Sequence, residues 1–223
     1  MLRAAIYDMD GLLLDSEPYW VEAELEVLGD VGVPLTPQLA RETTGMRLDE
    51  AVAHWYRRFP WKTETEAAVL ARLTRAAHRL ILARAAAKPG VQQSLQLFQT
   101  LGIRRALASS SPLTLIEAVV EKLGLVGQFE LTVSAESESH GKPHPAVYLT
   151  AAKRLGLEPS ECLALEDSVN GLTSAKAAGM RVIAVPEAAH RHDARYAAAD
   201  WVVDSLLDLD RLLLVRARLG ERS

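Results

Sequence analysis

The sequence predicts an α/β protein with a doubly wound, Rossmann-like parallel sheet and an inserted α-helical domain. Short apolar runs alternate with amphipathic segments of helical period along most of the chain. Several of these runs carry apolar residues at consecutive positions, as strands covered on both faces do. One long stretch, 16–85, has helical periodicity and no strand pattern. Strands that are joined through helices make right-handed crossovers, which place them parallel to one another in one sheet.

Six apolar runs are predicted as strands: 2–7, 103–108, 129–133, 162–165, 182–185 and 201–203. Most of them run directly into a polar or charged residue. In an open parallel sheet, ligands bind beyond the carboxyl ends of the strands. We therefore expect the chemistry of the protein among the polar residues that follow these runs.

Apolar residues spaced three or four apart predict four helices between the later strands, over 91–101, 113–123, 147–155 and 169–178. A glycine, which ends a helix readily, follows or closes each of them. These glycines are Gly102, Gly124, Gly156 and Gly179.

Within 16–85 the same spacing predicts three more helices, over 21–28, 48–59 and 69–80, punctuated by prolines. We expect residues 1–15 and 86–223 to form the core domain and residues 16–85 to form a helical cap domain. The last residues, 210–223, are predicted as an amphipathic terminal helix, with a partner surface as the alternative.

The composition is that of a globular protein and excludes several classes of partner. The 223 residues include 25 Lys and Arg against 29 Asp and Glu, a net charge of −4, whereas nucleic-acid binding needs a surplus of cations. No apolar run approaches the roughly 18 residues of a membrane span, and the first residues lack a signal-peptide pattern. A single cysteine, Cys162, fits a reducing compartment. We therefore expect a cytoplasmic protein without nucleic-acid or membrane contacts.

The strongest chemical signal is the segment Asp8-Met9-Asp10-Gly11 at the end of the first predicted strand. Side chains two residues apart in a strand face the same way, and two carboxylates on one side repel each other. A divalent cation removes that repulsion, and Mg²⁺ usually takes one or two carboxylates together with water and phosphate oxygens. The alternative is an acidic turn whose carboxylates are solvated.

Polar residues at three further places complete a set suited to phosphate chemistry. Ser109 offers a hydroxyl that can bind a phosphate oxygen, and Ser110 can assist it. Lys142 is a cation that could screen the charge of a phosphate from an attacking carboxylate. Glu166 and Asp167 add two acids at the end of another strand, where a metal would lie. Each alone could be a helix cap, a surface lysine or a solvated acid; together they supply all the groups needed at one sheet edge.

These motifs, in this order, resemble those of the haloacid dehalogenase-like phosphohydrolase superfamily. All four of its motifs are present, the resemblance covers nearly the whole chain, and the helical insert after the first motif is similar to its type 1 cap. The segments GLLLDSEPYW, TTGMRLDEAV, LASSSPL and ALEDSVNG further resemble the beta-phosphoglucomutase-like branch. Within that branch they are most similar to the 2-deoxyglucose-6-phosphate and hexitol-phosphate phosphatases.

The resemblance implies a role for each acid. Asp8 would attack phosphorus in line and form an aspartyl-phosphate. Asp10 would protonate the leaving alkoxide and then activate a water molecule. Mg²⁺ would be held by the Asp8 carboxylate, the Asp10 backbone carbonyl and Asp167, with Glu166 in direct or water-mediated support.

The resemblance also implies supporting roles. Ser109 and Lys142 would bind the phosphoryl oxygens, and Ser168 and Asn170 would support the metal ligands from behind. A cap of this kind supplies specificity and excludes water.

In the cap, Arg47 is the first candidate for a substrate contact, and a solvated arginine at a helix end is the alternative. Ser16, Glu17 and Trp20 are further candidates, although Trp20 also fits a helix core position.

The sequence therefore predicts a Mg²⁺-dependent phosphatase that acts, as a monomer, on a small phosphorylated sugar or sugar alcohol. A phosphomutase is the first alternative, but mutases of this branch carry a cap histidine, and no histidine occurs in 1–53, where Trp20 stands instead. A phosphatase of another small metabolite, such as phosphoglycolate, is the second alternative. A catalytically idle binding module would be expected to lose Asp8, Asp10 or Asp167, and all three acids are present.

Overall fold

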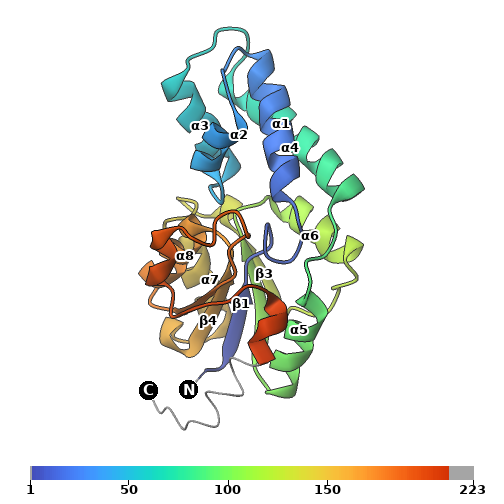
Figure 1. Ribbon diagram of the computed structural model, residues 1–223, viewed down its shortest axis with the longest axis vertical. Helices are drawn as coiled ribbons and strands as arrows, with labels where there is room; N and C mark the ends of the chain where they lie inside the picture. The colour runs from blue at the N-terminus through green and yellow to red at the C-terminus, as the bar shows by residue number, and fades with distance from the viewer. Residues whose placement is uncertain (1, 211–223) are drawn as a thin grey trace.

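The computed structural model describes residues 2–210 and confirms the predicted fold class (Figure 1). Six parallel strands form one sheet in the order β3-β2-β1-β4-β5-β6. They are β1 (Ala4–Tyr7), β2 (Arg104–Ser109), β3 (Leu131–Ser134), β4 (Cys162–Glu166), β5 (Arg181–Ala184) and β6 (Trp201–Val202). Each predicted strand coincides with one of these to within two residues at either end. The predicted terminal helix falls, except for its first residue, outside the described residues.

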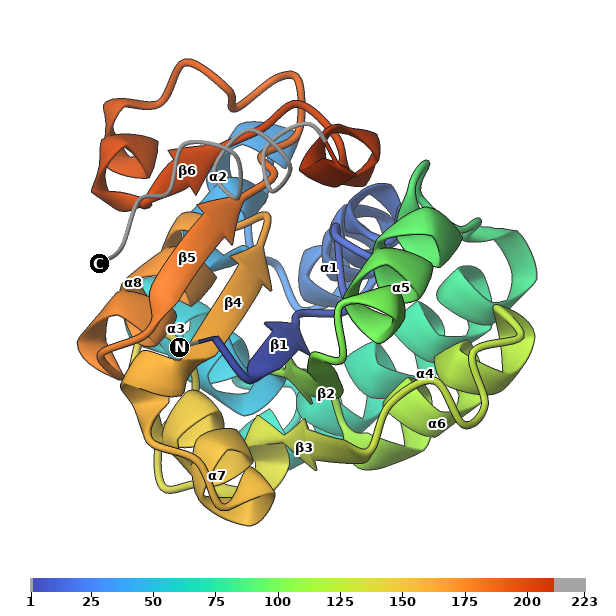
Figure 2. The same ribbon diagram turned by 90° about the horizontal axis from the view of Figure 1, so that it is seen from below.

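Helices cover both faces of the sheet (Figure 2). They are α5 (Val91–Thr100), α6 (Leu113–Lys122), α7 (Ala146–Leu155) and α8 (Val169–Ala177). Alternate residues of β1 enter different clusters: Tyr7 packs with Phe98 of α5, whereas Ile6 packs with Val147 of α7 and Leu172 of α8. The consecutive apolar residues of the strands are explained by this double coverage.

The first strand lies in the middle of the sheet, and its carboxyl end is where the chain connections diverge. Tyr7, the last residue of β1, pairs with Leu107 of β2 on one side and Leu165 of β4 on the other. The chain goes from β1 to β2 and β3 and then crosses to β4 on the far side. Asp8 thus follows β1 at a topological switch point, the usual ligand position in an open α/β sheet.

Four helices and a 3₁₀ turn stand above the carboxyl edge of the sheet (Figure 1). They are α1 (Glu17–Asp30), α2 (Pro37–Ala40), the turn Arg41–Thr43, α3 (Leu48–Arg58) and α4 (Glu66–Arg84). The three helices predicted here lie within α1, α3 and α4, apart from one residue of the second. The sequence did not predict α2, because four residues are too few to show a helical period; Thr36 caps it, and its hydroxyl accepts from the Leu39 N–H at 3.2 Å.

The two connections between the helical insert and the sheet run side by side. The Asp15 N–H donates to the Ala86 carbonyl at 3.0 Å, and the Lys88 N–H donates to the Leu13 carbonyl at 2.9 Å. These bonds join the segments next to the predicted boundaries at 15/16 and 85/86. Within residues 2–210, none of the helices is both long and apolar enough to cross a bilayer.

Candidate active site

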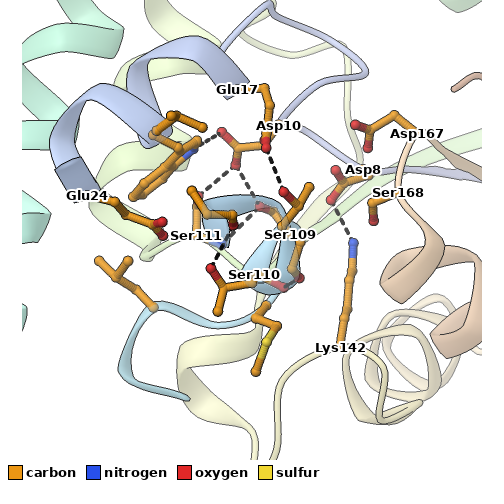
Figure 3. Close-up of a pocket in the computed structure, with 18 of the residues that line it drawn as sticks. Asp8, Asp10, Glu17, Glu24, Ser109, Ser110, Ser111, Lys142, Asp167 and Ser168 are labelled. Atoms are coloured by element: carbon orange, nitrogen blue, oxygen red, sulfur yellow. Dashed lines mark hydrogen bonds and ion pairs between the residues drawn. The ribbon is translucent and has the colours of Figure 1, made fainter. Parts of the chain in front are cut away.

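The site begins at Asp8, directly after β1. Its backbone N–H continues the sheet ladder by donating to the Leu165 carbonyl at 3.0 Å, which holds the residue in place. The residue is 6% exposed, and its Oδ1 accepts from Lys142 Nζ at 2.6 Å. A carboxylate and a cation are therefore in contact at one side of the pocket between the cap and the sheet (Figure 3).

The buried charge of Lys142 is fully paired. Besides Asp8, its Nζ donates to Glu166 Oε1 at 2.6 Å and to the Ala108 carbonyl at 3.2 Å. The Tyr148 hydroxyl donates to the same Glu166 oxygen at 2.5 Å. The two acids raise the pKa of Lys142 despite its burial, so the side chain stays charged. Glu166 thus orients the lysine, and Tyr148 in turn orients Glu166.

Three acids converge beside the lysine. One carboxylate oxygen from each of Asp8, Glu166 and Asp167 lies within 4.8 Å of the others. Burial raises the pKa of Asp8 to about 7, and it raises the pKa of Asp167 well above its ordinary range, with further repulsion from the neighbouring acids. A cation placed among them would remove this cost.

The donor set fits a hard divalent cation. Oδ1 of Asp167 is buried without a hydrogen-bond partner, as an oxygen that faces a metal would be in the bare protein. Both oxygens of Glu166 already accept bonds, from Lys142 and Tyr148 on one side and from Ser168 on the other. Asp8 and Asp167 therefore offer free carboxylate oxygens, and Glu166 supports them through Lys142.

Two glycines make room for these carboxylates. A Cβ on Gly11, whose φ is +75°, would lie 1.9 Å from Asp167 Oδ2. A Cβ on Gly171 would lie 1.9 Å from Glu166 Oε1. Any side chain at either position would push an acid out of the cluster.

Asp10 lies apart from this cluster and faces the cap. Its Oδ1 accepts from Ser16 Oγ at 2.8 Å and from Trp20 Nε1 at 2.9 Å. Its Oδ2 accepts from Ser111 Oγ at 2.7 Å and from Ser109 Oγ at 3.5 Å. The Asp10 carboxylate is therefore held by core serines on one side and by cap residues on the other (Figure 3). Sequence reasoning missed Ser111, although it continues the run of serines after β2.

Several predicted site residues join the cap to the core. The Ser110 hydroxyl donates to the Gly45 carbonyl at 2.9 Å, so it is engaged with a cap loop, and the residue also lines the pocket. Asn170 Nδ2 donates to the Thr44 carbonyl at 2.7 Å and contacts the cap in the same way. Ser168, unlike Ser110 and Asn170, supports an acid, because its hydroxyl donates to Glu166 Oε2 at 3.3 Å.

Arg47, the first cap candidate for a substrate contact, is not among the residues that line this pocket. Its guanidinium donates to the Ala135 and Glu138 carbonyls at 3.2 and 2.7 Å and pairs with Asp49 at 2.6 Å. Arg47 lies directly before α3, and from there its side chain reaches the two carbonyls in the segment that follows β3. Arg47 is thus a bridge between cap and core.

One face of α1 forms part of the cap wall of the pocket. Glu17, Trp20, Val21 and Glu24 follow one another at helical spacing and all line the pocket. Glu17 Oε1 accepts from the Thr44 hydroxyl at 2.6 Å. Glu24 was not predicted. Among the described residues that line the pocket, Lys142 is the one cation, and it lies at the Asp8 end.

A model of the haloacid dehalogenase-like hydrolases matches residues 2–179 of the chain. The chain belongs to this family. The matched range includes the acids, the lysine and the serines at the carboxyl edge of the sheet.

Similar proteins include named phosphatases. Hexitol phosphatase B of Escherichia coli (strain K12) is 42% identical over 209 residues, which cover 93% of this chain and 94% of that protein. The phosphorylated carbohydrates phosphatase of Thermotoga maritima is 31% identical, covering 82% and 84%. Among solved structures, CbbY from Rhodobacter sphaeroides in complex with phosphate has a TM-score of 0.83 and 28% identity, covering 94% and 96%.

The fold of this chain is also that of beta-phosphoglucomutase from Clostridium difficile, with a TM-score of 0.85 and full coverage of both chains. The identity is 22%, so this likeness concerns the fold alone.

Proposed function

We propose that the protein is a phosphatase that hydrolyses a monoester of a small sugar or sugar alcohol, with phosphorylated hexitols as the first candidates. The observation that carries the proposal is the contact of Asp8 with buried Lys142 beside the free oxygen of Asp167. This arrangement provides a nucleophile, a phosphate-binding cation and a metal ligand within one pocket. Relatives named for hexitol and carbohydrate phosphates, matched over most of their length, support the substrate class.

The phosphate would be bound at the Asp8 end of the pocket. Lys142 supplies the positive charge there, and Ser109, which is 1% exposed and lines the pocket, supplies a hydroxyl. Because Glu166 and Tyr148 fix the ammonium group, its position would not change when the substrate arrives. Such fixed donors stabilise the charge of the transferring group without reorganisation.

Asp8 would act as the nucleophile and receive the phosphoryl group as an aspartyl-phosphate. We propose Mg²⁺ as the cofactor, held by Asp8, Asp167 and the backbone carbonyl of Asp10. When bound, the ion would neutralise charge on the phosphoryl group during transfer. Lys142 contributes from the other side by favouring the charged form of Asp8.

Asp10 would give a proton to the leaving alkoxide and later take one from the attacking water. Its four hydrogen-bond donors fix the carboxylate, and two of them, Ser16 and Trp20, belong to the cap segment or its hinge. A closed cap would therefore hold the acid in place at the same time as it covers the substrate. The contact of Asp10 with an indole, where mutases of this branch carry a histidine, supports hydrolysis over a mutase reaction.

We also propose that the enzyme works in the cytoplasm as a monomer. The thiol of Cys162 is buried and free, which fits a reducing compartment. The site is covered by the chain's own cap, so a second subunit would not be needed to complete it.

A panel of sugar, sugar-alcohol and simple alkyl phosphates tests the proposal, with Mg²⁺ and with EDTA. We expect phosphate release from hexitol phosphates that EDTA abolishes and added Mg²⁺ restores. Asp8→Asn should remove the activity while the circular dichroism spectrum stays unchanged. Release of phosphate from none of the sugar or sugar-alcohol esters would contradict the proposal.

A further inference from the structure

Glu24 is a buried carboxyl that the catalytic scheme does not use. It belongs to α1, lines the pocket and is 7% exposed. Its Oε2 is buried without a hydrogen-bond partner. Figure 3 shows it on the side of the pocket away from Asp8, Asp167 and Lys142. A buried polar atom without a hydrogen-bond partner lowers the stability of the folded protein. We therefore expect a bound molecule to supply the partner of Glu24 Oε2.

No cation compensates Glu24. Among residues 2–210, no lysine or arginine forms an ion pair with it, and the groups that affect it are the Glu17 carboxylate and the Thr43 hydroxyl. Burial and Glu17 together raise the pKa of Glu24 to about 8. The neighbouring glutamates of α1 are different: Glu22 pairs with Arg84 and Glu26 pairs with Arg79, both at the surface.

We propose that Glu24 binds hydroxyl groups of the substrate at the end farthest from the phosphate. This inference rests on the proposed phosphatase function and adds the residue that selects the leaving group. A carboxyl oxygen accepts hydrogen bonds from alcohol hydroxyls in either protonation state. Glu17, Trp20 and Glu24 lie along one face of α1, so a substrate that reaches from Asp8 past Trp20 brings its far hydroxyls to Glu24.

The absence of a cation near Glu24 among the described lining residues disfavours substrates with a second anionic group. The far end of the pocket holds Glu24 and no cation, because Lys142, the one positive side chain among the described lining residues, is paired with Asp8. A carboxylate or second phosphate at that end would be desolvated with no cation among the described lining residues to pair with it. The selected class is thus a phosphate monoester with an uncharged, hydroxyl-rich alcohol, which excludes phosphoglycolate and bisphosphates.

The test compares kcat/KM for three compounds: sorbitol 6-phosphate, pentyl phosphate and phosphoglycolate. The first two are esters of a primary alcohol, and they differ in their hydroxyl groups and by one chain carbon. We expect the enzyme to prefer sorbitol 6-phosphate over both of the others. Glu24→Gln, which keeps the shape, should lower kcat/KM for sorbitol 6-phosphate about tenfold, and Glu24→Leu about 100-fold.

In the Glu24 variants, kcat/KM for pentyl phosphate measures whether the rest of the active site is intact. Its kcat/KM should change less than about threefold, since it makes no hydrogen bond to Glu24. Glu26→Gln removes a carboxylate from the exposed face of the same helix and should change neither value. The ratio of the two substrates corrects for any fraction of a variant that does not fold.

An unchanged preference for sorbitol 6-phosphate in both Glu24 variants would overturn this inference and leave the phosphatase function in place. Better turnover of phosphoglycolate than of sorbitol 6-phosphate by the unmodified enzyme would also overturn it. If the enzyme hydrolysed pentyl phosphate but no hydroxylated ester better, the proposed substrate class would fail, and the role of Glu24 would fail with it.

Discussion

The indole Nε1 of Trp20 donates to Oδ1 of Asp10 at 2.9 Å and so joins a cap helix to a carboxylate that follows β1. On the core side, Ser111 donates to Oδ2 of the same carboxylate at 2.7 Å. The position of the cap and the alignment of Asp10 are therefore coupled through the hydrogen bonds that Trp20 and Ser16 donate. This coupling gives a test of the acid role of Asp10.

Trp20→Phe should impair the acid step and leave the nucleophile intact. We expect kcat/KM to fall about tenfold for sorbitol 6-phosphate, since the bond to a charged acceptor is lost. For p-nitrophenyl phosphate it should fall less than about threefold, because p-nitrophenolate leaves without a proton. Trp61→Phe is the matched control, since that indole also lies in the cap and its Nε1 is buried without a partner. Equal losses for both substrates would argue against the coupling.

Tyr148→Phe should loosen Lys142 without removing it. The hydroxyl bond to Glu166 at 2.5 Å is lost, and we expect the free energy of unfolding to fall by about 2 kcal/mol. Activity should fall mainly through KM for the phosphate ester, because the lysine is less well fixed.

The control for this variant is Tyr7→Phe. It removes a buried hydroxyl whose partner is the neutral Ser94, and we expect a loss of about 1 kcal/mol with no change in KM. A KM for Tyr148→Phe equal to that of the unmodified enzyme would show that Tyr148 does not position the lysine.

The buried carboxyl of Glu24 should make stability depend on pH. Its pKa is raised to about 8 in the folded protein, whereas the unfolded chain titrates near pH 4.3. Between these values the folded state holds a proton that the unfolded state has released. Stability therefore falls as pH rises through this window, by roughly 1 kcal/mol per pH unit.

Urea unfolding at about pH 5.5 and about pH 7.5 measures this contribution as the difference between the unmodified protein and Glu24→Gln. The variant should gain stability relative to the unmodified protein as pH rises. A difference that stays constant over this range would mean that Glu24 is ionised throughout and has an ordinary pKa.

Metal binding should stabilise the protein through Asp167. With Mg²⁺ at about 100 times its Kd, the free energy of unfolding should rise by about 2.7 kcal/mol, seen as a Tm higher by several degrees. Asp167→Asn should remove this shift while raising the Tm of the metal-free protein, because a buried carboxyl in a repulsive cluster is gone. Asp193→Asn, at a surface pair with Arg195, should keep the full Mg²⁺ shift. A Mg²⁺ shift that survives Asp167→Asn would place the ion elsewhere.

The six strands could be predicted from the sequence because the run of apolar residues that marks each strand lies within the strand itself. Consecutive apolar residues followed by Asp8, Ser109 or Glu166 marked both the strand and its functional end. The structure brings Asp8, Lys142, Glu166 and Asp167 together at one edge of the sheet, where the sequence predicts them. The roles assigned to these residues remain proposals.

What the sequence could not predict depends on how the cap lies on the core. Arg47 and Ser110 look equally suited to a substrate and to a backbone carbonyl, and only the folded chain brings those carbonyls within reach. Glu24 is one of several acids in the segment EAELE, which reads as a solvated face. Its burial becomes visible only when α1 packs over the pocket. Its place seven residues after Glu17, on the same helix face, was the one available signal.

The central claim, that Asp8 carries the phosphoryl group during turnover, is tested most directly by mass spectrometry of acid-quenched enzyme. Enzyme mixed with excess sorbitol 6-phosphate and Mg²⁺ is quenched within one turnover and digested. We expect the peptide that contains Asp8 to carry one phosphoryl group, which hydroxylamine removes as it does from acyl phosphates. The fraction of enzyme phosphorylated on Asp8 should differ between Trp20→Phe and the unmodified enzyme, because Trp20 contacts Asp10, which would act in the formation and in the hydrolysis of the intermediate. Phosphate release with no phosphoryl group on Asp8, or with the group on another residue, would contradict the account.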